Sequence, residues 1–340
     1  MRIWIDLVNS PHVLFFRPII QELQARGHET LITTRYFAET VPLADRYGLH
    51  HTTLGFHGGK SVWGKATALI RHVLKQIVFI RGQGVDLAVS HNSYMQALAA
   101  RCLNIPLVTI MDYEHQPANH ISFRLAKRVL VPKTFSEEAL RKYGASLARS
   151  ARYNSIKEDV YLADFVPDPT FLATLGISPE KILVAMRPPA LAATYHRFEN
   201  PFFDELLAHV LAHPDTYVIL LPRTPDQHQR YGEMRHPNLL VPTQPLDGPN
   251  LIYHSDLVIS AGGTMNREAT VLGTPVYTVF KGTMGNVDQY LIQTGKMVQI
   301  SEPADVPKIV LEKKALGTTP VSRSQILEEI VEKILEVASF

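Results

Sequence analysis

The sequence predicts an α/β protein built from two doubly wound parallel-sheet domains. The chain has 340 residues, which exceeds the usual size of a single hydrophobic core. Apolar strand-like runs alternate with helix-like segments in both halves, the order expected when helices cover both faces of a parallel sheet. Hydrophobic residues make up 46% of the chain and charged residues 19%, so it can bury two sizeable cores.

The first half opens with a strand, a helix and a second strand. "MRIWIDLV" (1–8) has the continuous apolar pattern of a buried strand, and "RPIIQELQARGH" (17–28) has helical spacing with a glycine near its end. "ETLITTR" (29–35) then predicts the second strand. The same alternation predicts strands at 85–91, 106–111 and 128–132, and helices at 93–104 and 135–144.

A second series begins after the stretch 153–181, which carries three prolines and is typical of a connector between domains. Strands are predicted at 181–188, 216–223, 238–242, 257–260 and 275–280, and helices at 201–213 and 267–273. We therefore place one domain at 1–165 and the other at 166–340. The final segment, 324–340, predicts an amphipathic helix that can complete either half or pack across their interface.

Composition excludes several classes of function. The formal net charge is +2 with scattered Lys and Arg, so the chain lacks the basic patch of a nucleic-acid-binding protein. Its one cysteine, Cys102, excludes internal disulfides and cysteine-based zinc sites, and its apolar surroundings predict a buried, inert thiol. The N-terminus lacks a secretory signal, and no window holds the roughly 18 apolar residues of a membrane span. A cytoplasmic location is expected.

The stretch "SVWGKATALIRHVLKQIVFIRGQG" (61–84) has apolar residues at helical spacing, with Lys and Arg at the other positions. We favour a surface helix packed on its own domain. Association with a membrane surface or a lipid acceptor is the alternative and is not favoured.

A glycine turn in "SAGGTMNREATVLGTPVYTVF" (260–280) is the strongest candidate ligand site. Gly262 and Gly263 separate a strand from a helix beginning near Thr264, whose N-terminal N–H groups and dipole suit a phosphate. Glu268 lies one turn further, where a carboxylate can accept both hydroxyls of a ribose. The alternative is a plain strand-to-helix turn followed by a favourable acidic residue.

The longer stretch 252–300 resembles the nucleotide-sugar site of GT-B glycosyltransferases, especially bacterial MurG-type N-acetylglucosaminyltransferases, and of non-hydrolysing UDP-N-acetylglucosamine 2-epimerases. The resemblance implies two Rossmann-like domains facing a cleft. It also implies a diphosphate beside Gly262–Thr264, a ribose at Glu268, and a donor sugar at Asp288 and Gln289. Across the whole chain, "RYNSIKEDVYLADFVPDP" and "RPPALAATYH" resemble an uncharacterised bacterial and archaeal family of GT-B-like proteins.

The N-terminal stretch "DLVNSPHVLFFRPIIQELQARGHE" (6–29) resembles the first loop and helix of the same superfamily. The glycines expected there are replaced by Asn9, Ser10 and Pro11, while His12 remains. Helix capping by Asn9 or Ser10 and a first-turn proline explain part of this pattern. His12 opens a helix at the expected cleft and is the leading candidate for a general base.

"VTIMDYEHQPANHISFRLAKRVLVP" (108–132) places Asp112, Glu114 and His115 directly after a strand. The Asp-Tyr-Glu-His sequence resembles a His-Val-Glu-Ala sequence whose Glu lies in the cleft of the epimerases. Clustered acids and imidazoles shift one another's pKa values toward neutrality, which a general base requires. A base or sugar-binding role, a solvated loop and a metal site remain open.

Two arginines directly follow strands of the second half. Arg187 can bind a phosphate through two hydrogen bonds, and Arg223 can supply a second cation or form a surface salt bridge. "YHRFEN" (195–200) resembles the His-Arg-Arg-Glu-Asn run of the epimerases, displaced along its loop.

These observations predict a metal-independent, nucleotide-sugar-dependent glycosyltransferase with a UDP-type donor in the second domain and an unidentified acceptor in the first. No cofactor and no metal site is expected. His12, Asp112 and Glu114 are the candidates for the base. An epimerase of nucleotide sugars and a non-catalytic protein that binds them are the alternatives.

Overall fold

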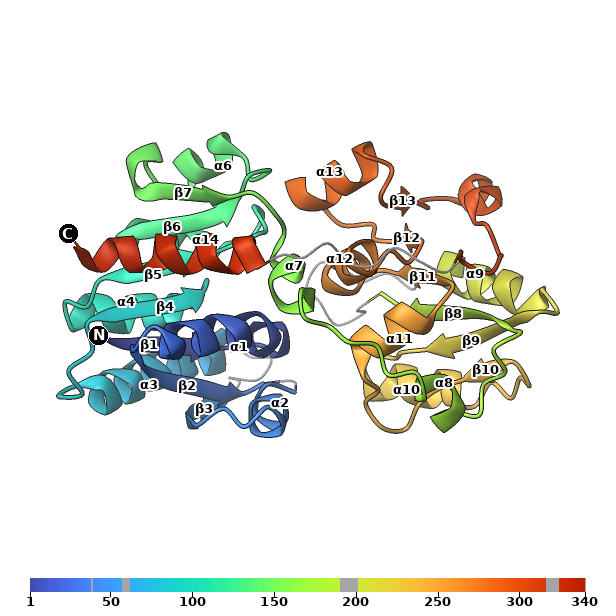
Figure 1. The fold of residues 1–340 in the computed structure, drawn as a ribbon, viewed down its shortest axis with the longest axis horizontal. Helices are drawn as coiled ribbons and strands as arrows, with labels where there is room; N and C mark the ends of the chain where they lie inside the picture. The colour runs from blue at the N-terminus through green and yellow to red at the C-terminus, as the bar shows by residue number, and fades with distance from the viewer. Residues whose placement is uncertain (38, 57–61, 190–200, 316–323, 340) are drawn as a thin grey trace. The chain divides into compact units, whose positions relative to one another are not determined.

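The computed structural model describes residues 1–37, 39–56, 62–189, 201–315 and 324–339. The chain divides into two compact units (Figure 1). Unit 1 comprises Met1–Tyr161, Gly285–Val287 and Ser322–Phe340, and unit 2 comprises Leu162–Met284 and Asp288–Val321. The change from one unit to the other falls at Tyr161 and Leu162, near the predicted boundary at residue 165.

Unit 1 is built on a seven-stranded sheet in the order β3-β2-β1-β4-β5-β6-β7. Every neighbouring pair is parallel, as the alternation of strands and helices predicted. The strands are β1 (Arg2–Leu7), β2 (Glu29–Tyr36), β3 (His51–Phe56), β4 (Leu87–His91), β5 (Leu107–Ile110), β6 (Arg128–Pro132) and β7 (Ser150–Tyr153).

Helices of unit 1 connect these strands and lie on both faces of the sheet (Figure 1). They are α1 (Ser10–Ala25), α2 (Thr40–Arg46), α3 (Val62–Ile80), α4 (Tyr94–Cys102), α5 (Asn119–Leu125), α6 (Glu137–Lys142), the 3₁₀ turn η1 (Leu147–Arg149), α7 (Lys157–Leu162), α14 (Ser324–Leu335) and the 3₁₀ turn η3 (Glu336–Ser339).

Helix α1 begins at Ser10, earlier than the apolar spacing predicted. Asn9 is in an extended conformation, and its side-chain oxygen accepts a hydrogen bond from the Ser10 amide. Pro11 lies in the first turn, where its missing N–H has no intrahelical partner to lose. This cap places His12 in the first turn of the helix, directly after β1.

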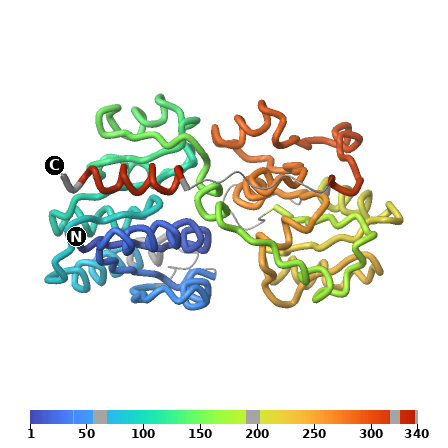
Figure 2. The backbone as a smooth tube through the Cα atoms, in the orientation of Figure 1, coloured from blue at the N-terminus to red at the C-terminus, as the bar shows by residue number. Residues whose placement is uncertain are grey.

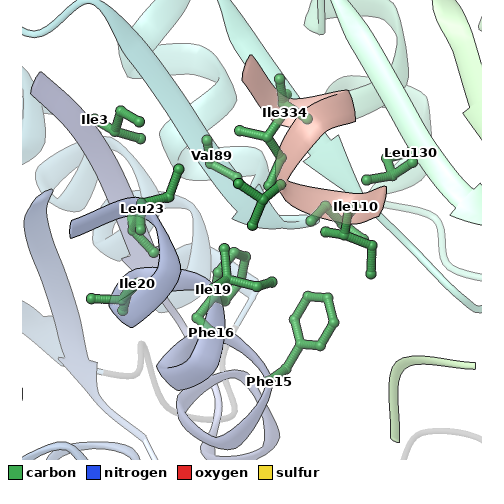
Figure 3. Close-up of a cluster of buried hydrophobic side chains, with 14 of the residues drawn as sticks. Ile3, Phe15, Phe16, Ile19, Ile20, Leu23, Val89, Ile110, Leu130 and Ile334 are labelled. Carbon is green, nitrogen blue, oxygen red and sulfur yellow. The ribbon is translucent and has the colours of Figure 1, made fainter. Parts of the chain in front are cut away.

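The C-terminal helix α14 completes the core of unit 1. It packs against α1 and β7, and Ile330, Val331 and Ile334 are fully buried there. Figure 2 shows the chain returning at its end to the unit in which it began. In Figure 3, Ile334 lies among side chains from the sheet, including Val89 and Ile110. The predicted amphipathic helix therefore belongs to the N-terminal unit.

Unit 2 contains a six-stranded parallel sheet in the order β10-β9-β8-β11-β12-β13. Its strands are β8 (Ile182–Arg187), β9 (Thr216–Leu220), β10 (Leu239–Leu240), β11 (Leu257–Ser260), β12 (Val276–Thr278) and β13 (Val298–Gln299). Its helices are α8 (Phe171–Thr174), α9 (Pro201–Ala212), α10 (Pro225–Gly232), α11 (Gly248–His254), α12 (Gly263–Leu272), the larger part of α13 (Asn286–Gln293) and the 3₁₀ turn η2 (Pro303–Lys308).

Both sheets reverse their strand order at one point, between β1 and β4 in unit 1 and between β8 and β11 in unit 2. In doubly wound sheets, ligands bind beyond the carboxyl ends of the strands at such a point. The loops that follow these four strands are therefore the places where functional side chains are expected.

Two further features concern the surface. Cys102 is exposed, so the predicted burial of its thiol is wrong. It is the last residue of α4 and follows the buried residues of that helix, which end at Ala100. Among the described residues, no helix combines the length and the apolar character needed to cross a membrane.

We predict that Ile334→Ala destabilises unit 1 by about 2–5 kcal/mol, because it removes a fully buried side chain from a packed core. Both tryptophans of the chain, Trp4 and Trp63, lie in unit 1, so fluorescence during urea unfolding reports on this unit. Glu332→Ala, on the exposed face of the same helix, is the matched control. Equal unfolding curves for the two variants would contradict the packing described here.

Candidate functional site

In unit 2, two arginines gather at the carboxyl ends of neighbouring strands. Arg187 is the last residue of β8, and Arg223 follows the end of β9. Helix α12 begins directly after β11, the other neighbour of β8, with Gly262 as its N-cap. Two cations and the N-terminus of a ten-residue helix therefore belong to the same edge of one sheet.

Both arginine side chains are half-buried. The Nε of Arg187 is buried and has no hydrogen-bond partner among the described residues, while the Nε of Arg223 donates to the carbonyl of Pro188 at 2.9 Å. Burial, together with the charge of Arg187, lowers the pKa of Arg223 to about 10. Burial also lowers the pKa of Arg187, against the opposing effect of Glu268. Two desolvated like charges are unfavourable without an anion between them.

Gly262 lies close to the end of the Arg223 side chain. Its φ of −117° and ψ of 137° are extended values that any residue adopts. A Cβ added there would lie 2.4 Å from Nη2 of Arg223, whereas one added at Gly263 would meet no atom within 4 Å. The two glycines thus have different surroundings. Gly262 lies against a guanidinium group, whereas Gly263 faces open space at the start of α12.

Glu268 is buried on α12, with 7% of its surface exposed. Its charge acts on Arg187, so this carboxylate and that guanidinium share one environment. Thr264 is half-buried in the first turn of the same helix. Asn266 donates from Nδ2 to the carbonyl of Ser260 at 3.2 Å, which ties the helix to the end of β11.

The residues predicted to face the donor sugar have partners of their own. Asp288 accepts two hydrogen bonds from Arg267, from Nε at 2.7 Å and from Nη2 at 3.0 Å. Gln289 is exposed and donates from Nε2 to the carbonyl of Met284 at 3.2 Å. The pair of Asp288 and Arg267 holds α13 to α12, and its proposed contact with a sugar stays a prediction.

Unit 1 carries a second cluster, at the carboxyl ends of β1, β4 and β5. His91 ends β4 and Asp112 follows β5. The Nε2 of His91 lies 3.2 Å from Oδ1 of Asp112, at an angle outside that of a hydrogen bond. Lys157 donates to Oδ2 of Asp112 and pairs with Glu158 at 2.8 Å. Asp112, predicted as a candidate base, thus has both oxygens beside cationic or ionisable groups.

His12 lies beside this cluster. Its ring centroid lies 4.8 Å from that of His91, and its buried Nδ1 has no hydrogen-bond partner among the described residues. Burial, and then the charges of His91 and Lys157, hold the pKa of His12 well below 6.5. His12 is therefore a neutral imidazole at pH 7, the protonation state that a general base needs.

Glu114 is also buried, with 3% of its surface exposed, while His115 beside it is exposed. Burial raises the pKa of Glu114, and its Oε1 has no hydrogen-bond partner among the residues described. Asn119 steadies this loop by donating from Nδ2 to the carbonyls of Tyr113, at 3.2 Å, and Glu114, at 3.3 Å. The loop is ordered by these contacts rather than simply solvated.

Sequence reasoning missed His91 and Lys157. His91 occupies the last position of a predicted strand beside the reversal of strand order, so its place in the βαβ pattern was an available signal. Lys157 lies in the stretch interpreted as a connector, and no local pattern pairs it with Asp112. "YHRFEN" (195–200) lies outside the described residues. Within the described ranges, no group of three or more His, Cys, Asp or Glu side chains is placed to hold a metal ion.

A family model described as "Protein of unknown function (DUF354)" matches residues 1–337. The chain belongs to the DUF354 family. Uncharacterized protein MJ0665 of Methanocaldococcus jannaschii is 28% identical over 312 residues, which cover 89% of each chain.

Solved enzymes share the fold of this DUF354 protein. The UDP-GlcNAc 2-epimerase of Neisseria meningitidis, solved bound to UDP-GlcNAc, has a TM-score of 0.75 at 14% identity, covering 99% of this chain and 100% of the epimerase. The glycotransferase of kitacinnamycin has a TM-score of 0.59 at 14% identity, covering 99% and 94%. The predicted GT-B-like fold of two parallel-sheet α/β domains is therefore confirmed.

We predict that unit 1 of the DUF354 protein loses stability as the pH falls below about 6.5, because His12 binds a proton when unfolded but not when folded. This one group contributes up to about 1.4 kcal/mol per pH unit in that range. His12→Gln removes the contribution.

Tryptophan fluorescence during urea unfolding, at pH 6.5 and one unit lower, measures the effect. Groups such as Glu114, whose raised pKa acts in the opposite direction, are present in both proteins and cancel in the comparison. Identical pH dependence of the two proteins would show that His12 titrates normally in the folded chain.

Proposed function

We propose that this DUF354 protein is a nucleotide-sugar-dependent glycosyltransferase whose donor binds in unit 2. The observation that carries the proposal is the pair of half-buried guanidinium groups of Arg187 and Arg223 at the sheet edge where α12 begins. Two half-buried cations favour an anionic ligand, and a diphosphate supplies two negative phosphoryl groups.

The donor site follows from these contacts. Arg187 and Arg223 bind the diphosphate, and the N–H groups of Gly263 and Thr264 at the start of α12 add donors aligned with the helix dipole. Glu268, one turn further and buried, accepts the hydroxyls of the ribose. Charge that develops on the departing nucleoside diphosphate is stabilised by these groups in the role that a divalent metal plays elsewhere.

The acceptor hydroxyl needs a base, and unit 1 offers His12. Its imidazole is neutral at pH 7 and its Nδ1 is unpaired among the described residues. Asp112, whose carboxylate contacts Lys157 and lies beside His91, acts on the charge and orientation of the imidazole groups. Glu114 has one unpaired oxygen and a raised pKa, and is the second candidate for the base.

Epimerisation of a nucleotide sugar is a second candidate function. It requires acids and bases around one sugar and no separate acceptor. The grouping of His12, His91, Asp112 and Glu114 at one edge of the unit 1 sheet favours it, because several proton-transfer groups are buried together. A solved 2-epimerase bound to UDP-GlcNAc has the same fold, which also supports this candidate.

We predict that UDP and UDP-GlcNAc bind the full chain and that Arg187→Gln or Arg223→Gln weakens this binding about tenfold to a hundredfold. Each substitution removes charged hydrogen bonds that contribute roughly 1.5–3 kcal/mol. Calorimetric titration measures the affinities, and Arg235→Gln, which changes an exposed arginine of unit 2, is the matched control.

Parallel titrations with GDP, CDP, ADP and dTDP and their sugars identify which nucleobase the protein prefers. If neither a nucleoside diphosphate nor its sugar binds the wild-type protein, the proposal fails. Where binding is found, incubation of the nucleotide sugar without acceptor separates the two functions. An epimerase converts its substrate alone, whereas a glycosyltransferase leaves the sugar configuration unchanged until an acceptor is added.

We predict that Gly263→Ala weakens nucleotide binding while leaving the melting temperature unchanged or slightly raised. The added methyl group meets only open space in the free protein, so any loss of affinity reports the close approach of the ligand to this turn. Affinity titration and thermal unfolding of the same variant measure both effects. Unchanged affinity would place the phosphates away from Gly263.

A further inference from the structure

Helix α3 of unit 1 has one face seated on its own domain and the other exposed. It packs against β3 and α4, and His72 and Gln76 are buried on that side. The fit to β3 is close, because a Cβ added at Gly55 would lie 2.2 Å from Nδ1 of His72. The prediction that this helix packs on its own domain therefore holds for one of its faces.

The outer face carries a row of large apolar side chains. Ile70, Leu74 and Val78 are 60%, 55% and 76% exposed. Because they are four residues apart on a helix, they lie one above another along a single stripe. Single exposed apolar residues are normal on protein surfaces, whereas a continuous row marks a surface that binds something.

The charges beside this stripe all have one sign. Arg71 and Lys75 are exposed and each directly follows a residue of the stripe, and Arg81 is exposed just beyond the end of the helix. Between Asp45 and Asp86 the sequence contains no Asp or Glu, although the whole chain has a net charge of only +2. The apolar stripe is thus flanked by cations that no acidic residue of the same segment compensates.

We propose that this face, formed by Ile70, Leu74 and Val78 with Arg71, Lys75 and Arg81, docks on the surface of an anionic lipid bilayer. Apolar side chains enter the boundary between headgroups and acyl chains, and the flanking cations contact the lipid phosphates. The complementarity of charge favours this partner over a second copy of the chain, because a two-fold interface would bring the same cations together. The inference is independent of the proposed enzymatic function.

Sedimentation of the full chain with vesicles tests the inference. Vesicles of equimolar phosphatidylglycerol and phosphatidylcholine are compared with vesicles of phosphatidylcholine alone. We expect binding to the anionic vesicles that weakens as the salt concentration rises. Replacing Arg71, Lys75 and Arg81 by Gln lowers the partition coefficient roughly fivefold for each cation removed.

A triple variant with Ile70→Ser, Leu74→Ser and Val78→Ser tests the apolar stripe. We expect it to bind anionic vesicles at least about tenfold more weakly than the wild type. The matched control carries Leu147→Ser, Val166→Ser and Val310→Ser, which change side chains that are 47%, 81% and 53% exposed elsewhere. Circular dichroism verifies that every variant is folded.

Several outcomes would overturn the inference. Failure of the wild-type chain to bind anionic vesicles is one, and equal binding by the wild type, the serine variant and the glutamine variant is another. Light scattering supplies a third. If the wild type is a dimer that the serine substitutions dissociate, and it does not bind vesicles, the stripe is a contact between copies of the chain.

Discussion

The burial of two like charges is the constraint on which the interpretation of unit 2 depends. Arg187 and Arg223 lie at the ends of adjacent strands, and each side chain is half-buried, which lowers the pKa of its guanidinium group. Removing a charge from water costs several kcal/mol unless a partner compensates it. The negative charge of Glu268 offsets part of this cost at Arg187. The part of the cost that is not offset favours an anionic ligand beside the two arginines.

The cluster at the carboxyl ends of the unit 1 strands differs from that of unit 2 in its balance of charge. Its buried cation, Lys157, is matched by the carboxylates of Asp112 and Glu158, so the charges are compensated within the protein. His12 is left without a charge because its burial, more than the neighbouring charges, lowers its pKa. The site in unit 2 thus has an excess of positive charge, whereas the cluster in unit 1 combines a neutral imidazole with acidic groups.

The sequence was sufficient to predict the two parallel sheets, because buried parallel strands are continuous apolar runs and amphipathic helices have a distinct period. It also placed Arg187, Arg223 and Gly262 correctly at the ends of strands. Apolar spacing alone placed the start of α1 too late, whereas the capping pattern of Asn9 and Pro11 predicted it correctly.

Interactions between distant residues were beyond local patterns. The pairing of Lys157 with Asp112 joins positions 45 residues apart, and Arg267 with Asp288 joins positions 21 apart. The reason for a glycine at position 262 was also inaccessible, because it depends on the approach of Arg223 from another strand. Such contacts are created by the order of strands in the sheet, which no single segment encodes.

The place of α14 has a consequence for synthesis on the ribosome. Unit 1 includes Met1 but also has Ile330, Val331 and Ile334 in its core, so its apolar surface stays incompletely covered until α14 has been made. All the strands of unit 2 are translated earlier and can pair first. The core of unit 1 is therefore completed only after every strand of unit 2 has been made.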